Sequence, residues 1–121
     1  MTRVHIAGRE VELAPPPKFS TRWQIIRAYN EHRSVPDLVF CAALGACWTG
    51  KGRPKATYAY DPMAYGAAVL DDLADRGIEA GEILEAGAEA FLLVLHTQYP
   101  SKDDIEAAEG NGEPPPESTT G

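Results

Sequence analysis

The chain has few cysteines, no long apolar run and no sequence like a secretion signal. Its two cysteines, Cys41 and Cys47, would lie on different faces of a helix, a placement that does not suit a disulfide. We therefore expect both thiols to be reduced and buried, as in a cytosolic protein. No segment reaches the roughly 18 apolar residues that a membrane-spanning helix needs. The first residues, Met-Thr-Arg-Val-His, lack the apolar core of a signal peptide, so we expect neither membrane insertion nor secretion.

The sequence also lacks the spacings that metal sites and nucleophilic catalysis require. The candidate ligands are His5, His32, His96, Cys41 and Cys47, and no two of them have a Cys-x2-Cys or His-x3-His spacing. We expect His96 to be a charge partner near the end of a helix and Cys41 to serve in packing. We therefore predict a protein that is not an enzyme and that holds no metal and no cofactor.

A phosphate-binding loop is nearly matched by residues 45–51, which read Gly-x4-Gly-Lys, but two requirements fail. A residue with a hydroxyl should follow the lysine to hold magnesium, and a helix should begin there. Instead Gly52 follows, and Pro54 stands where the helix would form. We predict that residues 49–55 form a basic loop and not a nucleotide site.

Charge is unevenly distributed along the chain, whose formal net charge is −7. Residues 1–55 hold nine Lys and Arg against four Asp and Glu, whereas residues 56–98 hold one basic residue against eight acids. The last stretch, 99–121, holds one basic residue against six acids. A basic half and an acidic half would allow copies of the chain to associate head to tail, or would suit a charged partner. The simpler alternative is that both halves are only solvated.

A short β-hairpin is predicted at the start of the chain. Apolar and polar residues alternate over residues 3–13, on both sides of Ala7-Gly8. Alternation with a period of two around a glycine is typical of two antiparallel strands joined by a tight turn. Two strands alone are marginally stable in water, so the hairpin must lie on helices or pair with another chain. Residues 15–17 are three prolines, which predict an extended link to the next element.

A helical hairpin is predicted over residues 61–99. Asp61 and Pro62 suit the N-cap and the first turn of its first helix, and Gly77 suits the left-handed residue just beyond that helix. The second helix, residues 80–99, is the most apolar segment of the chain, and its apolar residues recur at steps of three and four.

Two earlier helices are predicted between the prolines and the basic loop. The first begins at a cap residue, Ser20 or Thr21, and runs to about Arg33. The second covers residues 38–48, a nearly continuous apolar run, with Ser34 as a candidate cap. A buried strand is the alternative for this run, but its length and alanine content favour a helix.

Together these elements predict a mainly α protein with a short N-terminal β-hairpin, that is, a small α+β fold with a helical bundle of about four helices. We expect one globular domain over residues 1–100, with the hairpin at 1–14 and the helical body at 19–99. The last stretch, 101–121, is acidic and rich in proline and glycine, and we expect it to be disordered.

The order of these parts resembles that of the small tail assembly chaperones of long-tailed bacteriophages and related prophages. Members of this family often open with a hairpin like residues 4–13, followed by a proline-bearing link, a compact helical body and an acidic C-terminus. The resemblance covers most of the chain as an arrangement and not as a fixed motif. It implies a non-enzymatic protein of the host bacterial cytoplasm that binds the tail tape measure protein and helps the tail tube protein to assemble around it. Such chaperones are absent from the finished particle.

Protein contacts are predicted for five large apolar residues, each of which would also suit a core. They are Trp23, Ile26, Phe40, Trp48 and Tyr58. A homo-oligomer is compatible with the opposite charges of the two halves.

Two alternative functions remain open. The first is a structural head–tail or tail-completion subunit that is retained in the virion. The second is a small nucleic-acid-binding regulator that uses the basic loop, with Lys51, Arg53 and Lys55 as its basic patch. We favour a protein partner over nucleic acid, because the most apolar helix is no recognition helix. Residues 79–95 hold four Glu and neither Lys nor Arg, so DNA would repel them.

Overall fold

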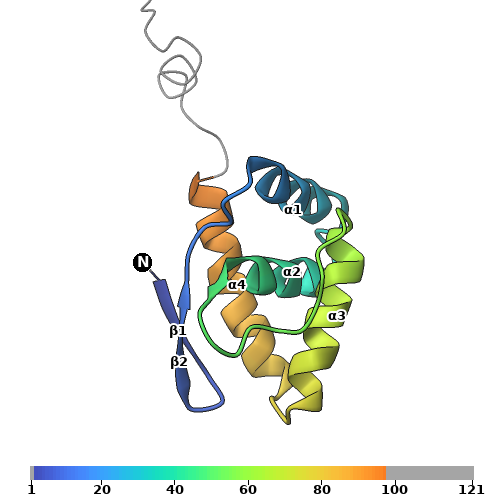
Figure 1. Ribbon diagram of the computed structural model, residues 1–121. Helices are drawn as coiled ribbons and strands as arrows, with labels where there is room; N and C mark the ends of the chain where they lie inside the picture. The colour runs from blue at the N-terminus through green and yellow to red at the C-terminus, as the bar shows by residue number, and fades with distance from the viewer. Residues whose placement is uncertain (1, 98–121) are drawn as a thin grey trace, which may run out of the picture.

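The computed structural model describes residues 2–97, and over this range the chain forms a small α+β fold with a three-stranded sheet and four helices (Figure 1). The elements follow in the order β1 Thr2–Ile6, β2 Arg9–Leu13, α1 Phe19–Glu31, α2 Asp37–Cys47, β3 Trp48–Thr49, α3 Pro62–Asp75 and α4 Ala80–Thr97. The predicted fold class is confirmed. The predicted disordered tail, 101–121, lies outside the described residues.

The N-terminal hairpin forms as the alternation predicts. β1 and β2 pair antiparallel with Val4 opposite Val11, and the turn consists of Ala7 and Gly8, whose φ angles are 54° and 77°. Two consecutive residues with positive φ are the signature of the type I′ turn, whose twist matches that of the flanking strands. The apolar residues of the alternation, which include Ile6 and Leu13, point into the core. The hairpin therefore lies on the helices, which is one of the two arrangements expected.

A third strand was not predicted. The helix expected over residues 38–48 ends one residue earlier, because Trp48 leaves helical geometry with φ −67° and ψ 125°. Trp48 and Thr49 then pair antiparallel with Leu13 and Glu12 as β3. A strand of two residues has no periodicity of its own, so only its pairing with a distant strand reveals it.

The predicted start of α1 and the predicted cap of α2 at Ser34 are wrong. α1 begins at Phe19 after Lys18, earlier than a cap at Ser20 or Thr21 would allow, and Lys18 makes no side-chain cap hydrogen bond. α2 likewise follows Pro36 without a side-chain cap. Neither N-terminus is marked by a capping side chain, which is why a search for cap residues misplaced both caps.

The signals of the second helical hairpin are confirmed. The carboxylate of Asp61 accepts a hydrogen bond from the backbone N–H of Ala64 at 3.3 Å, and Pro62 opens α3. Gly77 follows the end of α3 with a φ of 88°. Aspartate and proline thus start the helix and glycine ends it, each in the role that its chemistry suits.

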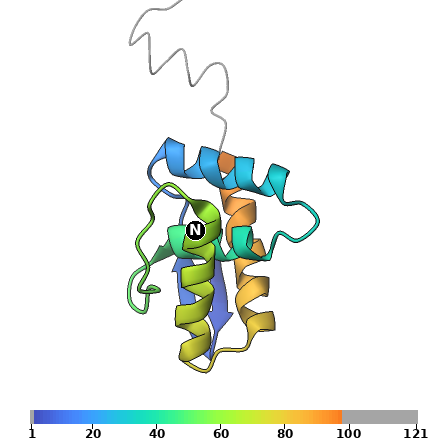
Figure 2. The same cartoon turned by 90° about the vertical axis from the view of Figure 1, so that its right-hand side faces the viewer.

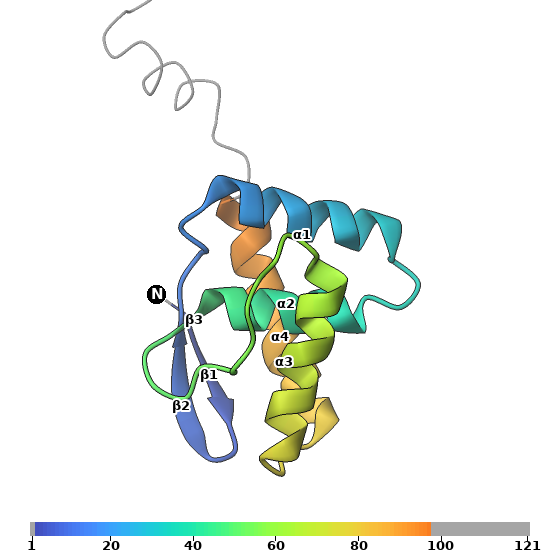
Figure 3. The ribbon, with the colours of Figure 1, turned by 45° about the vertical axis from the view of Figure 1, so that its right-hand side comes forward.

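The centre of the molecule is α2, which crosses the neighbouring pair α3 and α4, as Figure 2 and Figure 3 show. Glycines on α3 and α4 let these helices approach it closely. A Cβ at Gly66 would overlap the backbone oxygen of Leu38, and a Cβ at Gly87 would lie 2.6 Å from the backbone oxygen of Phe40. α1 lies across the end of the molecule where α4 finishes (Figure 3). No helix within residues 2–97 is both long enough and apolar enough to cross a bilayer.

Candidate protein-binding surface

Two large aromatic side chains of α1 are exposed side by side. Phe19 is 47% exposed and Trp23 is 44% exposed, and their rings stack with centroids 6.5 Å apart. Residues four apart on a helix lie on the same face, so the local sequence alone brings this pair together. An exposed aromatic pair on a small domain is typical of a binding surface.

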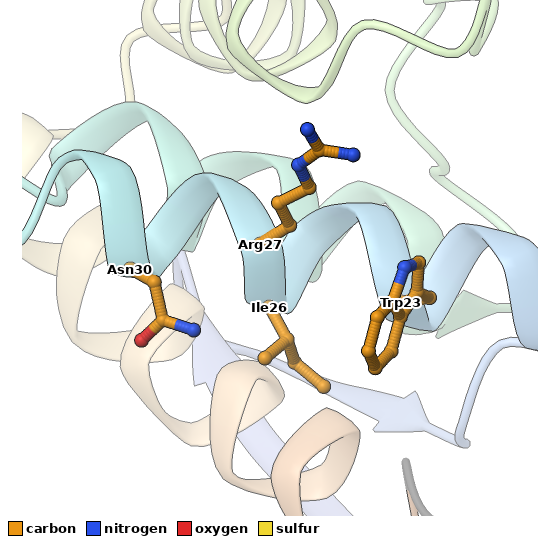
Figure 4. Close-up of a pocket in the computed structure, with 4 residues that line it drawn as sticks. All are labelled: Trp23, Ile26, Arg27 and Asn30. Atoms are coloured by element: carbon orange, nitrogen blue, oxygen red, sulfur yellow. The ribbon is translucent and has the colours of Figure 1, made fainter.

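A cavity of about 260 Å³ continues this face along α1. It is lined by Trp23, Ile26, Arg27 and Asn30, which follow at steps of three and four along the helix (Figure 4). Ile26 is itself only 5% exposed and forms the apolar part of the lining. We call these four residues together with Phe19 the α1 surface.

The charge around the α1 surface is mainly positive. α1 and the residue before it carry Lys18 and Arg27, together with the half-buried Arg22, whose charge acts on the thiol of Cys47. The acidic residue of this helix is Glu31. Arg27 and Glu31 form an ion pair at 3.6 Å, in which both side chains are more than half exposed. Such a pair contributes little to stability, so Arg27 can rearrange at little cost when a partner binds.

Phe40 connects helices inside the molecule. Its ring lies 6.2 Å from that of Tyr29 and 5.5 Å from that of Phe91, and these two rings are 4.6 Å apart. The cluster joins α1, α2 and α4 and is partly buried. Rings at such separations pack favourably, so Phe40 is placed to hold α1 on the rest of the domain.

Trp48 and Tyr58 also lie apart from the α1 surface. Trp48 is 4% exposed, and its indole N–H donates to the backbone oxygen of Lys51 at 3.0 Å. The hydroxyl of Tyr58 hydrogen-bonds Gln24, and its ring meets that of Tyr65 at 5.2 Å. Burial raises the pKa of Tyr58 to about 12, and nearby groups such as Asp61 add to this effect. Of the five residues predicted to contact a protein partner, Trp23 and Ile26 therefore lie on the α1 surface, and Phe40, Trp48 and Tyr58 lie elsewhere. Contact of any of the five with a partner stays a prediction.

The predicted basic loop, residues 49–55, is hydrogen-bonded to the end of α2 and to the end of α3. The guanidinium of Arg76 donates to the backbone oxygens of Gly52 and Arg53 at 2.7 and 3.1 Å and pairs with Asp72 at 2.6 Å. The Arg53 side chain donates to the backbone oxygen of Gly45 at 3.0 Å. These bonds hold the backbone of the loop in place.

The basic patch is consequently divided. Lys51, Arg53 and Lys55 are all exposed, but the Arg53 guanidinium is bound to the backbone oxygen of Gly45 near the end of α2. Asp72 lies beside the patch, because it accepts a hydrogen bond from the backbone N–H of Lys55 at 3.2 Å. Nucleic-acid binding by this loop stays a prediction, which retention at low salt and its loss on neutralisation of the three residues would test.

The two thiols are buried in α2. Burial raises the pKa of Cys41 to about 12, with a further contribution from Asp37, and it raises the pKa of Cys47 to about 12 as well. The thiol of Cys47 donates to the backbone oxygen of Ala90 at 3.7 Å. Protonated thiols in such surroundings are poor nucleophiles at neutral pH. Across the described part of the chain, no group of three or more His, Cys, Asp or Glu side chains could hold a metal ion.

Sequence reasoning missed Phe19, the second aromatic residue of the α1 surface. Its spacing of four from Trp23 was the available signal, but a helix placed to begin at Ser20 or Thr21 leaves Phe19 outside. Exposure of Leu92 on α4, at 46%, was also not predicted. Comparison of the chain with known protein families, with curated proteins and with solved structures found no match.

Proposed function

We propose that this chain is a non-enzymatic tail assembly chaperone of a long-tailed bacteriophage or prophage. It binds the tape measure protein in the host bacterial cytoplasm and aids assembly of the tail tube. The observation that carries the proposal is the α1 surface, on which an exposed aromatic pair adjoins an apolar-lined cavity. The hairpin, the proline link and the helical body in this order support it, since they are the parts that carry the family resemblance.

The α1 surface has the chemistry that such a partner requires. A tape measure protein is long, helical and apolar, so its helices expose apolar stripes before the tube encloses them. Phe19 and Trp23 offer flat apolar area to one stripe, and the cavity beside Ile26 can receive a side chain from it. Arg27 at the rim of the cavity can pair with an acidic residue of the bound helix.

Co-expression with the tape measure protein of the same genome tests the proposal. We expect the chain to move that protein into the soluble fraction and to co-purify with it. The double variant Phe19→Ala, Trp23→Ala should lose both effects while keeping its helical circular dichroism. Val35→Ala is the matched control, because Val35 is 65% exposed but lies between α1 and α2. A tape measure protein that stays insoluble beside the parent chain contradicts the proposal.

The composition of purified virions separates the chaperone from a structural subunit. A chaperone acts transiently, so mass spectrometry of the particles should detect no stoichiometric amount of this chain. A stoichiometric signal would instead identify a head–tail or tail-completion subunit.

A further inference from the structure

The α1 surface lies next to the point where the described chain ends. α4 finishes at Thr97 beside α1, whereas the β1–β2 turn and the α3–α4 turn lie at the opposite end of the molecule (Figure 1, Figure 3). Packing contacts confirm this placement, because the ring of Phe91 on α4 meets that of Tyr29 on α1 at 4.6 Å. Thr97 lies a turn and a half beyond Phe91, so residues that follow it start within reach of the α1 surface.

The residues that follow have the complementary chemistry. Residues 98–109 read Gln-Tyr-Pro-Ser-Lys-Asp-Asp-Ile-Glu-Ala-Ala-Glu, with four acids against one lysine and with Tyr99 and Ile105 as large apolar residues. The α1 surface offers exposed aromatic rings within a mainly basic setting. An apolar and acidic segment therefore matches an apolar and basic surface.

We propose that residues 98–109 bind the α1 surface of their own molecule. Tyr99 and Ile105 pack against Phe19 and Trp23, and the acids around Ile105 face the basic residues of α1. The proposal rests on the α1 surface and on the position of Thr97, and it does not depend on the proposed function.

Connection through the chain makes such weak contacts effective. A short link gives the segment an effective concentration in the millimolar range at the α1 surface, so an affinity too low for two separate molecules suffices. Exposed ion pairs contribute little singly and are screened by salt, with a Debye length of about 3 Å at 1 M. The contact is therefore expected to weaken as salt rises, and any partner that uses the α1 surface must compete with it.

A nitroxide label on the full chain tests the proposal. Ala108→Cys supplies a labelling site, and the buried thiols of Cys41 and Cys47, with pKa values of about 12, are poor competitors for the reagent. We expect the label to weaken the NMR signals of the α1 amides several-fold more than those at Gly8 and Gly77. The difference should decrease at high salt.

Charge variants outside the folded domain provide the controls. Asp103→Asn, Asp104→Asn and Glu106→Gln together should reduce the effect on α1, whereas Glu113→Gln with Glu117→Gln should leave it unchanged. Both variants alter only residues beyond α4, so loss of folding cannot explain a difference between them. The proposal is overturned if the two variants behave alike, or if the largest effect falls on the loop 49–55. It is also overturned if labelled chains weaken the α1 signals of unlabelled, isotope-enriched chains in a mixture, because that result assigns the segment to a second copy.

Discussion

Helices α2 and α1 are similar in length but differ in what surrounds them. α2 is buried along most of its length, with Val39, Cys41 and Leu44 fully inaccessible to solvent. α1 contributes three buried residues to the core and leaves Phe19 and Trp23 exposed. The comparison teaches that the most completely buried helix and the exposed aromatic pair are different parts of the fold. Changes in α2 or its neighbours should affect folding, while changes on the outer face of α1 should affect association.

Among the single changes that test this comparison, Gly66→Ala should lower the free energy of unfolding most. The added Cβ would overlap the backbone of Leu38 on α2, and backbone cannot move aside as a flexible side chain can. We expect a loss of about 3 kcal/mol or more in the free energy of unfolding, measured by urea denaturation. Gly81→Ala is the matched control, since a Cβ at Gly81 meets nothing within 4 Å. It should stabilise the protein by about 0.5–1 kcal/mol, and equal effects of the two changes would contradict the close approach of α3 to α2.

Truncating one apolar side chain on α2 and one on α1 tests whether the two helices differ in their contribution to stability. Leu44→Ala removes a fully buried side chain of α2 and should lower the free energy of unfolding by about 3 kcal/mol. Phe19→Ala removes a ring that is 47% exposed and should change it by only about 0.5 kcal/mol. Thermal and urea unfolding of both variants measure the difference. A loss at Phe19 as large as that at Leu44 would show that the Phe19 ring belongs to the stabilising core.

Alkaline pH should destabilise the folded protein, because the two buried thiols of α2 resist deprotonation. The pKa of Cys41 and of Cys47 rises from 9.0 to about 12 in the folded protein. Below pH 9 both states keep their thiol protons and the stability is complete. Above pH 9 the unfolded chain loses these protons first, so the free energy of unfolding falls as pH rises from 9 to about 12. Tyr58, whose pKa rises from 10.0 to about 12, adds to the fall above pH 10.

Chemical denaturation at successive pH values from 8 to 12 measures this slope. Each thiol can lower the free energy of unfolding by at most about 1.4 kcal/mol for every tenfold fall in proton concentration. The double variant Cys41→Ala, Cys47→Ala should show a flatter dependence than the parent chain. An unchanged slope in that variant would mean that the thiols do not titrate in the way their burial requires.

Substitutions at the helix caps should change the stability of the protein least. Asp61→Ala removes the side-chain cap of α3 and should cost about 1 kcal/mol. Lys18→Ser supplies α1 with the cap that it lacks and should add about 0.5 kcal/mol. Melting temperatures of the two variants measure both changes. A destabilising effect of Lys18→Ser would show that the lysine has a role at this position other than preceding the helix.

The parts of the fold that the sequence predicted correctly are those with local signals. Ala7-Gly8 can form a tight turn with two positive φ angles, and Asp61, Pro62 and Gly77 suit one end of a helix each. The N-termini of α1 and α2 lack such side-chain signals, so their predicted caps were misplaced by a few residues. β3 depends on pairing with Leu13, a partner far away in the sequence, and therefore had no local signal at all.

The candidate surface was likewise predictable only where local sequence spacing determines it. Trp23 and Ile26 come together because helical spacing places them on one face. Phe40 was indistinguishable from them in sequence, but Phe91 from α4 covers it. Which apolar residue remains exposed is decided by elements that are distant along the chain, and hydrophobicity alone does not contain that information.

The central position of α2 has a consequence for how the molecule opens. Amide hydrogens in α2 can exchange with solvent only when the helices that cross it separate, which amounts to unfolding the domain. α1 packs on one end of the domain through its buried residues Ile25, Ile26 and Ala28 and through the contacts of Tyr29 with Phe40 and Phe91, and its outer face is uncovered. We expect its amides to exchange through a partial opening that leaves α2 shielded. The helix that carries the α1 surface is thus expected to separate from the domain before α2 is exposed.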